Sequence, residues 1–174
     1  ANIYDEIEKT IDYLRLRLSK KINLEFDNSK QKIYVYMNKQ LFSWSLENII
    51  KNSIDAIKEK GKVTIRVSEV DEYVKIFILD NWVGINKSIR KKIFNPGITT
   101  KERGWGLGLS LAKRIIEEYH NGEIKVEEST IGQGTKMMIK LKGVKWSCNQ
   151  FSSFMKIRFR KSHLDGKISI FHCI

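Results

Sequence analysis

Hydrophobic residues recur along this chain in two spacings, and these spacings predict the order of its helices and strands. Steps of three and four residues predict helices over 3–20, 39–58 and 109–119. Alternation of apolar and polar residues predicts six strands, which cover 22–26, 32–37, 62–69, 73–80, 122–129 and 135–142. A turn at Asp71–Glu72 would join two of these strands into an antiparallel hairpin.

The order of these elements predicts an α/β sandwich, an α+β arrangement in which helices pack on one face of a mixed, largely antiparallel sheet. We expect this domain to cover residues 1–142. Residues 143–174 lose the periodicity and mix bulky aromatic side chains with basic ones. We interpret them as a C-terminal extension that is packed on the domain, frayed from it, or foreign to the natural fold through a frame change or read-through.

The composition fits a soluble globular domain. The chain has 174 residues, of which 41% are apolar and 30% charged, a balance that is ordinary for one domain with a substantial core. It contains no apolar run long enough to span a membrane and no recognisable signal peptide. Cys148 and Cys173 both lie in the extension, and their spacing with His163 and His172 matches no common zinc site. These features predict a cytoplasmic, reducing setting.

The net charge of +12 raises the alternative of nucleic-acid binding, because a basic surface attracts phosphate backbones. The lysines are spread along the chain rather than clustered, and the extension alone carries +5. We therefore expect no direct binding of nucleic acid as the main role. Small acidic partners such as nucleotides remain compatible with this charge.

Residues 81–108 are the strongest candidate for a binding loop. This segment holds the only proline and five of the eleven glycines, and loops of this length inside a compact domain are usually functional. Gly104, Gly106 and Gly108 directly precede a predicted helix. Glycines let a backbone approach a ligand closely, and the N–H groups at a helix start attract phosphate. A purely structural glycine turn is the alternative.

Two asparagines on the predicted helix 39–58 offer a candidate metal ligand. Asn48 and Asn52 are four residues apart and therefore share one helix face. An amide oxygen suits Mg²⁺, which takes few protein ligands together with substrate phosphates. The alternative is an ordinary polar face in contact with solvent.

A carboxylate and a polar loop offer contacts to the two ends of a nucleotide. Asp80 closes an apolar strand shortly before Gly84, and its carboxylate could accept a hydrogen bond from the amino group of a base. Thr99, Thr100 and Lys101 lie beside the glycine run and are suitable phosphate contacts. A strand-terminal turn and a solvated loop are the corresponding alternatives.

Taken in order, these segments resemble a known family. ENIIKNSIDAI at 47–57 is similar to the N box, DNWVGI at 80–85 to the G1 box, and IFNPGITTK at 93–101 to the F box and lid. GWGLGLSLAKRII at 104–116 is similar to the G2 box, and IGQGTKMMIKL at 131–141 to the closing glycine-threonine segment. Over residues 1–142 the chain thus resembles the ATP-binding catalytic domain of bacterial sensor histidine kinases. These domains have the Bergerat-type ATP-binding fold of the gyrase, Hsp90, histidine kinase and MutL superfamily.

The resemblance implies a role for each matching residue. Asn52 would bind Mg²⁺, and Asn48 would support the phosphate end of the site. Asp80 would bind the adenine amino group, and Thr135 would line the adenine pocket. Lys101 would hold phosphates and, with Asn48 and Asn52, would make up the catalytic set. The other positions expected to contact ATP, by backbone or side chain, are Gly84, Ile85, Phe94, Thr99, Thr100, Gly104, Gly106, Leu107, Gly108 and Leu109.

The resemblance also implies the reaction and its partners. The γ-phosphoryl group of ATP would pass to a histidine on a separate dimerisation domain, and a response regulator would act downstream. No histidine precedes His120, so we expect a catalytic fragment of a larger homodimeric kinase, and a membrane-anchored parent is compatible with the resemblance. His120 itself stands before a glycine turn, and we interpret it as structural.

Trp82 and Asn48 keep two alternative functions open. Trp82 replaces the first glycine of the G1 box, and a large side chain against the adenine would weaken binding, as in a non-catalytic module that keeps only the fold.

ATP-hydrolysing members of the superfamily use a glutamate four residues before the metal-binding asparagine as general base. That position is Asn48 here, which cannot accept a proton, and Glu47 is displaced from Asn52 by about 140° around the helix. This pattern favours phosphoryl transfer over hydrolysis.

Overall fold

The domain consists of a five-stranded sheet and three main helices. The computed structural model describes residues 1–19, 21–28, 32–57, 59–99 and 105–144. Its helices are α1 (Ile3–Arg15), α2 (Lys39–Ala56) and α3 (Gly108–Arg114), with a short 3₁₀ turn at Lys92–Phe94. Its strands are β1 (Ile22–Phe26), β2 (Gly61–Val70), β3 (Tyr73–Asp80), β4 (Glu123–Thr130) and β5 (Gly134–Lys142).

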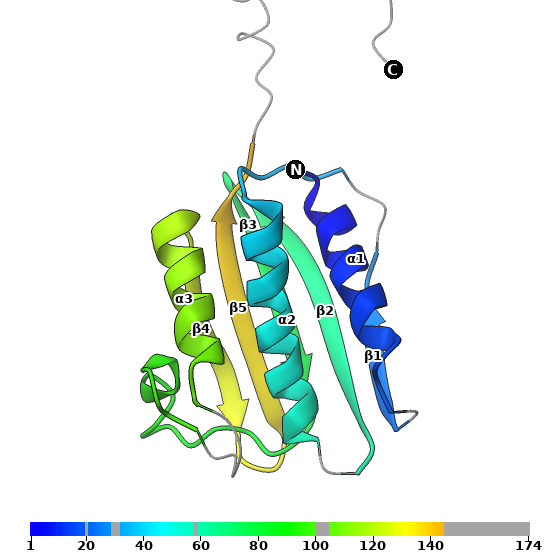
Figure 1. The fold of residues 1–174 in the computed structure, drawn as a ribbon, viewed down its shortest axis with the longest axis vertical. Helices are drawn as coiled ribbons and strands as arrows, with labels where there is room; N and C mark the ends of the chain where they lie inside the picture. Colours follow the sequence, from blue (N-terminus) through cyan, green and yellow to red (C-terminus); the bar gives the residue numbers. More distant parts are fainter. Residues whose placement is uncertain (20, 29–31, 58, 100–104, 145–174) are drawn as a thin grey trace, which may run out of the picture.

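The sheet is mixed, and all three helices cover the same face of it. The strand order is β1-β2-β3-β5-β4, in which β1 and β2 are parallel and every other pair is antiparallel. Figure 1 shows α1, α2 and α3 side by side in front of the sheet. The predicted α/β sandwich is therefore confirmed, including the hairpin between β2 and β3.

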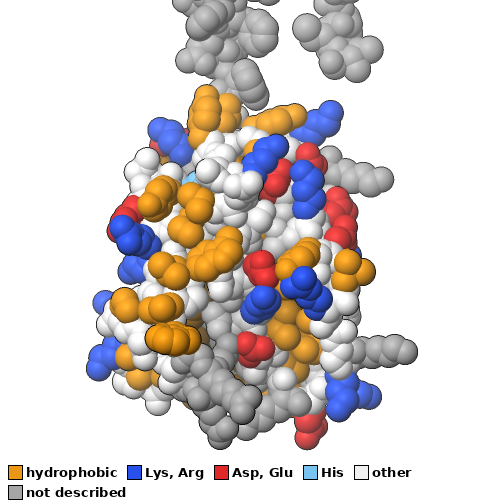
Figure 2. Space-filling view, viewed as in Figure 1, with side chains coloured by type: hydrophobic (Ala, Val, Ile, Leu, Met, Phe, Trp, Pro, Cys, Tyr) orange, Lys and Arg blue, Asp and Glu red, His pale blue; other side chains and the backbone are white. Residues whose placement is uncertain are grey.

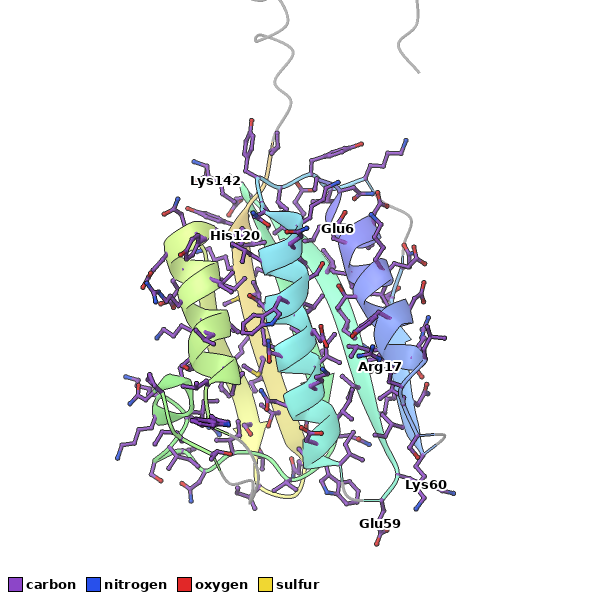
Figure 3. All side chains as sticks on the ribbon, in the orientation of Figure 1. Glu6, Arg17, Glu59, Lys60, His120 and Lys142 are labelled. Atoms are coloured by element: carbon purple, nitrogen blue, oxygen red, sulfur yellow. The ribbon has the colours of Figure 1, made fainter. Side chains whose placement is uncertain are left out.

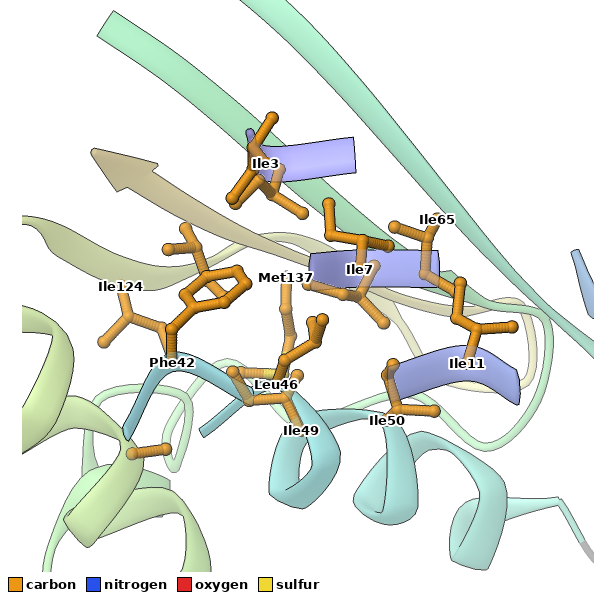
Figure 4. Packing of buried hydrophobic residues seen from close by; sticks show 14 of the residues in the cluster. Ile3, Ile7, Ile11, Phe42, Leu46, Ile49, Ile50, Ile65, Ile124 and Met137 are labelled. Carbon is orange, nitrogen blue, oxygen red and sulfur yellow. The ribbon is translucent and has the colours of Figure 1, made fainter. Parts of the chain in front are cut away.

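The core lies between the sheet and the helices, because both present one apolar side to it. Alternate residues of the central strands are buried, whereas their neighbours point to the open face of the sheet. The helices contribute residues at steps of three and four (Figure 4). The fully buried side chains of these helices include Ile3, Ile7, Ile11, Phe42, Leu46, Ile49, Ile50 and Ile116.

The prediction for the first helix was wrong at its end. We expected a helix over 3–20, but α1 ends at Arg15, and Leu16 is 88% exposed. The chain then turns so that Ile22 can pair with Gly61 at the start of β2. The apolar spacing continues past Arg15 because Leu18 still packs against the core from this turn.

The predicted strand over 32–37 is also absent from the sheet. In the described residues of this segment, Tyr34 and Val35 form only isolated bridges, to Asn2 and Gly143. Ile33 and Val35 are buried, whereas Tyr34 between them and Tyr36 after them are exposed. Alternation of apolar and polar residues therefore indicates that one side of an extended segment is buried, whether or not the segment belongs to a sheet.

The remaining elements match their predictions to within one or two residues, apart from the last turn of α3. The helix expected over 39–58 ends at Ala56, and Lys58 lies outside the described residues. The helix expected over 109–119 begins at Gly108, and its last turn, Ile115–Tyr119, widens into a π turn. The exact end of a helix depends on hydrogen bonding and capping, and the spacing of apolar residues does not reveal it.

His120 ties the C-terminal end of α3 to the beginning of α2. Its Nε2 accepts the backbone N–H of Asn38 at 3.1 Å, and its Nδ1 lies 2.9 Å from the carbonyl oxygen of Ile115. Because a carbonyl only accepts, Nδ1 carries the proton. The ring is buried between the upper ends of the two helices (Figure 3). The interpretation of His120 as structural is confirmed.

We predict that His120→Ala lowers the free energy of unfolding by about 2–3 kcal/mol, since it removes a buried ring and the partners of the part-buried Asn38 N–H and Ile115 carbonyl. Urea denaturation would measure the change. Glu118→Ala is the control, because Glu118 is exposed and pairs only with the exposed Arg114. Equal stability of the two variants would contradict the structural role.

Candidate functional site

The candidate site lies at one end of the sheet. The described parts of the segment 81–107 gather there, beside the C-terminal half of α2 and the first residues of α3 (Figure 1). β3 ends at the same place with Asp80. The predicted site residues on three distant parts of the sequence are thus brought to one end of the molecule.

Asp80 is the best-connected side chain at this end. Its Oδ1 accepts the backbone N–H of Thr135 at 3.1 Å and that of Trp82 at 3.3 Å. The hydroxyl of Ser53 on α2 lies near this carboxylate. Burial raises the pKa of Asp80 above its ordinary value of 3.8, and the hydrogen bonds from Trp82 and Thr135, with the nearby Ser53 hydroxyl, offset this only in part. The carboxylate is therefore well oriented but poorly solvated.

Two glycines let the loop after β3 dock directly on the turn between β4 and β5. Gly84 has φ +73°, and a Cβ there would overlap the carbonyl oxygen of Thr130. Gly134 has φ +117°, and a Cβ there would overlap the carbonyl oxygen of Asp80. A hydrogen bond from Gly132 N–H to the Val83 carbonyl, 2.9 Å long, joins the same two segments. Gly84 thus allows the two backbones to pack closely. Its neighbour Ile85 is half-buried.

Ser129 and Arg90 belong to this junction, and neither was predicted from the sequence. The Ser129 hydroxyl accepts the N–H of Ile85 at 2.7 Å and lies 3.0 Å from the hydroxyl of Thr135. The Arg90 guanidinium donates to the carbonyl oxygens of Ile85 and Ser129. Nothing in the local pattern distinguishes Arg90 from the lysines that follow it, so only the fold reveals its role.

Ser53 was also missed, although the sequence contains a signal for it. It is buried four residues after Ile49 and four before Ile57, so it is a polar residue within the apolar stripe of α2. Its hydroxyl lies near the Asp80 carboxylate, which accounts for that exception. A small polar residue at a core position of a helix thus indicates a polar partner on the element that packs against that helix.

Asn48 and Gly108 meet at the other part of the site. The Asn48 amide nitrogen donates to the Trp44 carbonyl at 2.8 Å. Its Oδ1 would lie only 3.1 Å from a Cβ at Gly108, so α2 approaches the start of α3 closely here. Asn52 is half-buried one turn further along α2. The two asparagines therefore lie along the same edge of α2, as their spacing predicted.

The remaining predicted residues divide between the core and the loop surface. Phe94 is buried in the core, with Lys113 of α3 5.5 Å from its ring centre. Leu109 packs against the core, whereas Leu107 and Thr99 are exposed. Gly106 has φ +63° and packs against Gly97 and Ile98. Thr100, Lys101 and Gly104 lie outside the described residues.

Comparison with known proteins decides the family. The profile described as "Histidine kinase-, DNA gyrase B-, and HSP90-like ATPase" matches residues 39–145. The chain belongs to this ATPase family. Nucleotide binding is the shared property of its members, and the match includes every described residue of the junctions around Asp80 and Asn48.

Two curated relatives illustrate the match. The signal transduction histidine-protein kinase AtoS of Escherichia coli is 42% identical over 103 residues, which cover 59% of this chain and 16% of the relative. Sporulation kinase D of Bacillus subtilis is 35% identical over 113 residues, which cover 65% of this chain and 22% of the relative. The chain thus spans less than a quarter of the length of these kinases.

Solved structures agree with the fold. The nucleotide-free catalytic domain of the histidine kinase ThkA has a TM-score of 0.71 at 27% identity, and the match covers 82% of this chain and 93% of that domain. ThkA in complex with the response regulator protein TrrA matches with a TM-score of 0.69 at 26% identity, over 82% of this chain and 40% of that one. The chain therefore carries a catalytic domain of the type found in sensor histidine kinases. No helix in its described ranges is long and apolar enough to cross a membrane.

The donor set of this ATPase-family domain fits a Mg²⁺ ion that arrives with the nucleotide. Among the described residues there is no group of three or more histidine, cysteine or acidic side chains that could hold an ion alone. The amide oxygens of Asn48 and Asn52 are neutral oxygen donors on one edge of α2. Mg²⁺ usually takes one or two protein ligands and completes its shell with phosphate and water. Asn52, with Asn48 beside it, is therefore a suitable holder.

We predict that Asp80→Asn does not destabilise the domain at pH 7, because the amide keeps an acceptor oxygen without the penalty of a buried charge. Since the folded-state pKa of Asp80 is raised, its charge costs stability above that pKa, and the cost disappears as pH falls below 3.8. The difference in unfolding free energy between Asp80→Asn and the unchanged protein should therefore shrink on acidification.

Denaturation series at several pH values would test this. Asp27→Asn is the control, because it makes the same substitution at an exposed side chain. A difference for Asp80→Asn that stays constant from pH 7 to pH 4 would overturn the prediction.

Proposed function

We propose that this domain binds Mg·ATP between α2, α3 and the end of β3 and transfers the γ-phosphoryl group to a histidine on a separate dimerisation domain. The observation that carries the proposal is the pair of junctions on α2. Ser53 lies near Asp80 at the proposed base end, and Asn48 lies beside Gly108 at the proposed phosphate end. Five residues of helix separate them by about 7.5 Å, which is the scale of the ribose between base and phosphates.

At the base end, Asp80 would accept a hydrogen bond from the adenine amino group. Its Oδ1 already holds two backbone N–H groups, which orient the carboxylate before a ligand arrives. Thr135 lies beside it, and Gly84 allows the backbone after β3 to pack against Thr130, so that the backbone at 84–85 would border the base. A pre-oriented acceptor needs no rearrangement on binding, and this favours affinity.

At the phosphate end, backbone amides around Gly106 and Gly108 and the side chain of Lys101 would hold the phosphates. Asn52 would hold Mg²⁺, and Asn48 would support this end from α2. When bound, the ion would neutralise charge on the phosphates. The contribution of the chain is then mostly the fixed positions of these groups.

The side chains nearest the proposed γ-phosphate favour transfer to a histidine over hydrolysis. Asn48 cannot take a proton from water. Glu47 is paired with Lys51 through a 2.6 Å contact and lies on another side of α2 from Asn52. Without a general base for water, a histidine that brings its own nucleophilic nitrogen is the better acceptor.

An apolar surface on the helices suits the acceptor domain. Trp44 on α2 and Leu107, Leu111 and Tyr119 along α3 are between 39% and 61% exposed, and Figure 2 shows apolar side chains gathered over this part of the helix face. The surface begins beside the proposed phosphate end, so a helical domain docked on it would bring its histidine near the nucleotide. We further propose a homodimeric cytoplasmic parent and a response regulator as the next acceptor, which the ThkA–TrrA complex supports by analogy.

Calorimetric titration with Mg²⁺ and a non-hydrolysable ATP analogue tests the proposal. We expect binding by the unchanged chain, and an affinity reduced about tenfold or more in Asn52→Ala and Asp80→Asn. Asn52→Ala should also lose the gain in affinity that Mg²⁺ provides, whereas Asp80→Asn should keep it. Absence of binding by the unchanged chain would leave a non-catalytic module with the same fold.

The reaction itself is tested with radiolabelled ATP and the histidine-bearing domain of the parent protein, where acid-labile phosphate on that domain is expected. Steady ATP hydrolysis that disappears in Glu47→Ala would instead identify an ATP-hydrolysing member of the family.

We predict that Trp82→Gly tightens ATP binding. Trp82 stands where the related G1 boxes have glycine, and its half-buried ring packs against the core next to Asp80. If the ring takes space that the base needs, its removal should lower the dissociation constant in the same titration. The double variant with Asp80→Asn should lose this gain, and equal affinity of Trp82→Gly and the unchanged chain would disprove the idea.

A further inference from the structure

We infer that Arg90 is a positioning residue that holds the base-binding turn in place and thereby sets the preference for adenine over guanine. This inference rests on the proposed function, because it assigns a role within the same site. Arg90 does not belong to any of the boxes that the chain shares with its relatives.

The contacts of Arg90 join the two segments that form the base end. Its Nε lies 3.4 Å from the carbonyl oxygen of Ile85, and its Nη2 donates to the carbonyl oxygen of Ser129. Ile85 is the residue directly after Gly84, and Ser129 lies near the end of β4. One planar cation therefore bridges the loop after β3 and the end of a strand.

Together with Ser129, Arg90 binds both polar groups of the Ile85 backbone. The Ile85 N–H donates to the Ser129 hydroxyl at 2.7 Å, while the Ile85 carbonyl accepts from Arg90. The peptide units on both sides of Ile85 are thus held, one by Ser129 of β4 and the other by Arg90 five residues further along the loop. Since Gly84 has no side chain to restrict its backbone, these contacts supply the restriction that the glycine lacks.

The position of this turn matters for the choice of base. Adenine presents an amino donor to Asp80, whereas guanine presents a carbonyl oxygen at the same place, which a carboxylate repels. This discrimination requires that the base cannot shift away from Asp80. The backbone at 84–85 would confine the base to that position. A loosened turn would therefore weaken ATP binding and also let GTP compete better.

Arginine is suited to this task, and lysine is a poor substitute. The guanidinium offers several N–H donors in one plane and can serve two carbonyl groups at once, whereas an ammonium is a point donor at the end of a flexible chain. Among the described residues, Arg90 has no carboxylate within ion-pair distance, so its bonds to the backbone are its main interactions there.

The test compares Arg90→Ala and Arg90→Lys with Lys91→Ala, an exposed neighbour whose loss removes the same charge from the same segment. For Arg90→Ala we expect the dissociation constant for Mg·ATP to rise about tenfold and the preference for ATP over GTP to shrink. Arg90→Lys should fall in between, and Lys91→Ala should match the unchanged chain. In the phosphotransfer assay the KM for ATP should rise while kcat at saturating ATP stays within about twofold.

Hydrogen exchange at the Ile85 amide separates this inference from the proposed function. Exchange should be faster in Arg90→Ala than in Lys91→Ala, whether or not nucleotide binds. If the unchanged chain binds no ATP, the proposed function fails while this measurement still tests the hold on the turn. Unchanged exchange in Arg90→Ala, or faster exchange with unaltered ATP affinity and purine preference, would overturn the role of Arg90.

Discussion

A poorly solvated carboxylate at the end of a central strand holds three parts of this domain together. Asp80 reaches β5 through Thr135, the following loop through Trp82, and α2 through Ser53. Burying a charge in this way is unfavourable unless hydrogen bonds compensate it. The raised pKa of Asp80 indicates that the compensation is incomplete. The domain thus keeps a costly group at the one point from which a base could be bound, a frequent property of functional sites.

The two ends of α2 have different tasks. At its N-terminal end, His120 closes the contact with α3 by two hydrogen bonds to the backbone, and this end is built for stability. At its C-terminal half, Asn48 and Ser53 are aimed at the loop and at Asp80. The helix between them fixes the separation of Asn48 and Ser53, and thus of the proposed phosphate and base ends.

Most of the fold was predictable from periodicity, because the core is two-sided and its elements are regular. The misplaced end of α1 and the false strand over 32–37 have one cause, since in both the apolar spacing records burial and not hydrogen bonding. Asn48, Asn52 and Asp80 were proposed as site residues from residue type and position; the fold brings them to one end of the molecule, and their roles stay predictions. Ser129 and Arg90 were not proposed, because their partners at this junction are mainly backbone atoms, and a backbone atom leaves no residue type to recognise.

The backbone of the segment that resembles the G1 box differs at positions 82 and 84 in its tolerance of a side chain. Among the described non-glycine residues, positive φ angles occur at Asp71 and Asn121 and not at Trp82. A side chain at position 82 is therefore compatible with the main chain, and a mutation there meets no immediate barrier to folding. At Gly84 the positive φ and the contact with Thr130 exclude any side chain. A side chain at the first position of the motif therefore leaves the fold intact, whereas a side chain at the second position would force apart the loop after β3 and the end of β4.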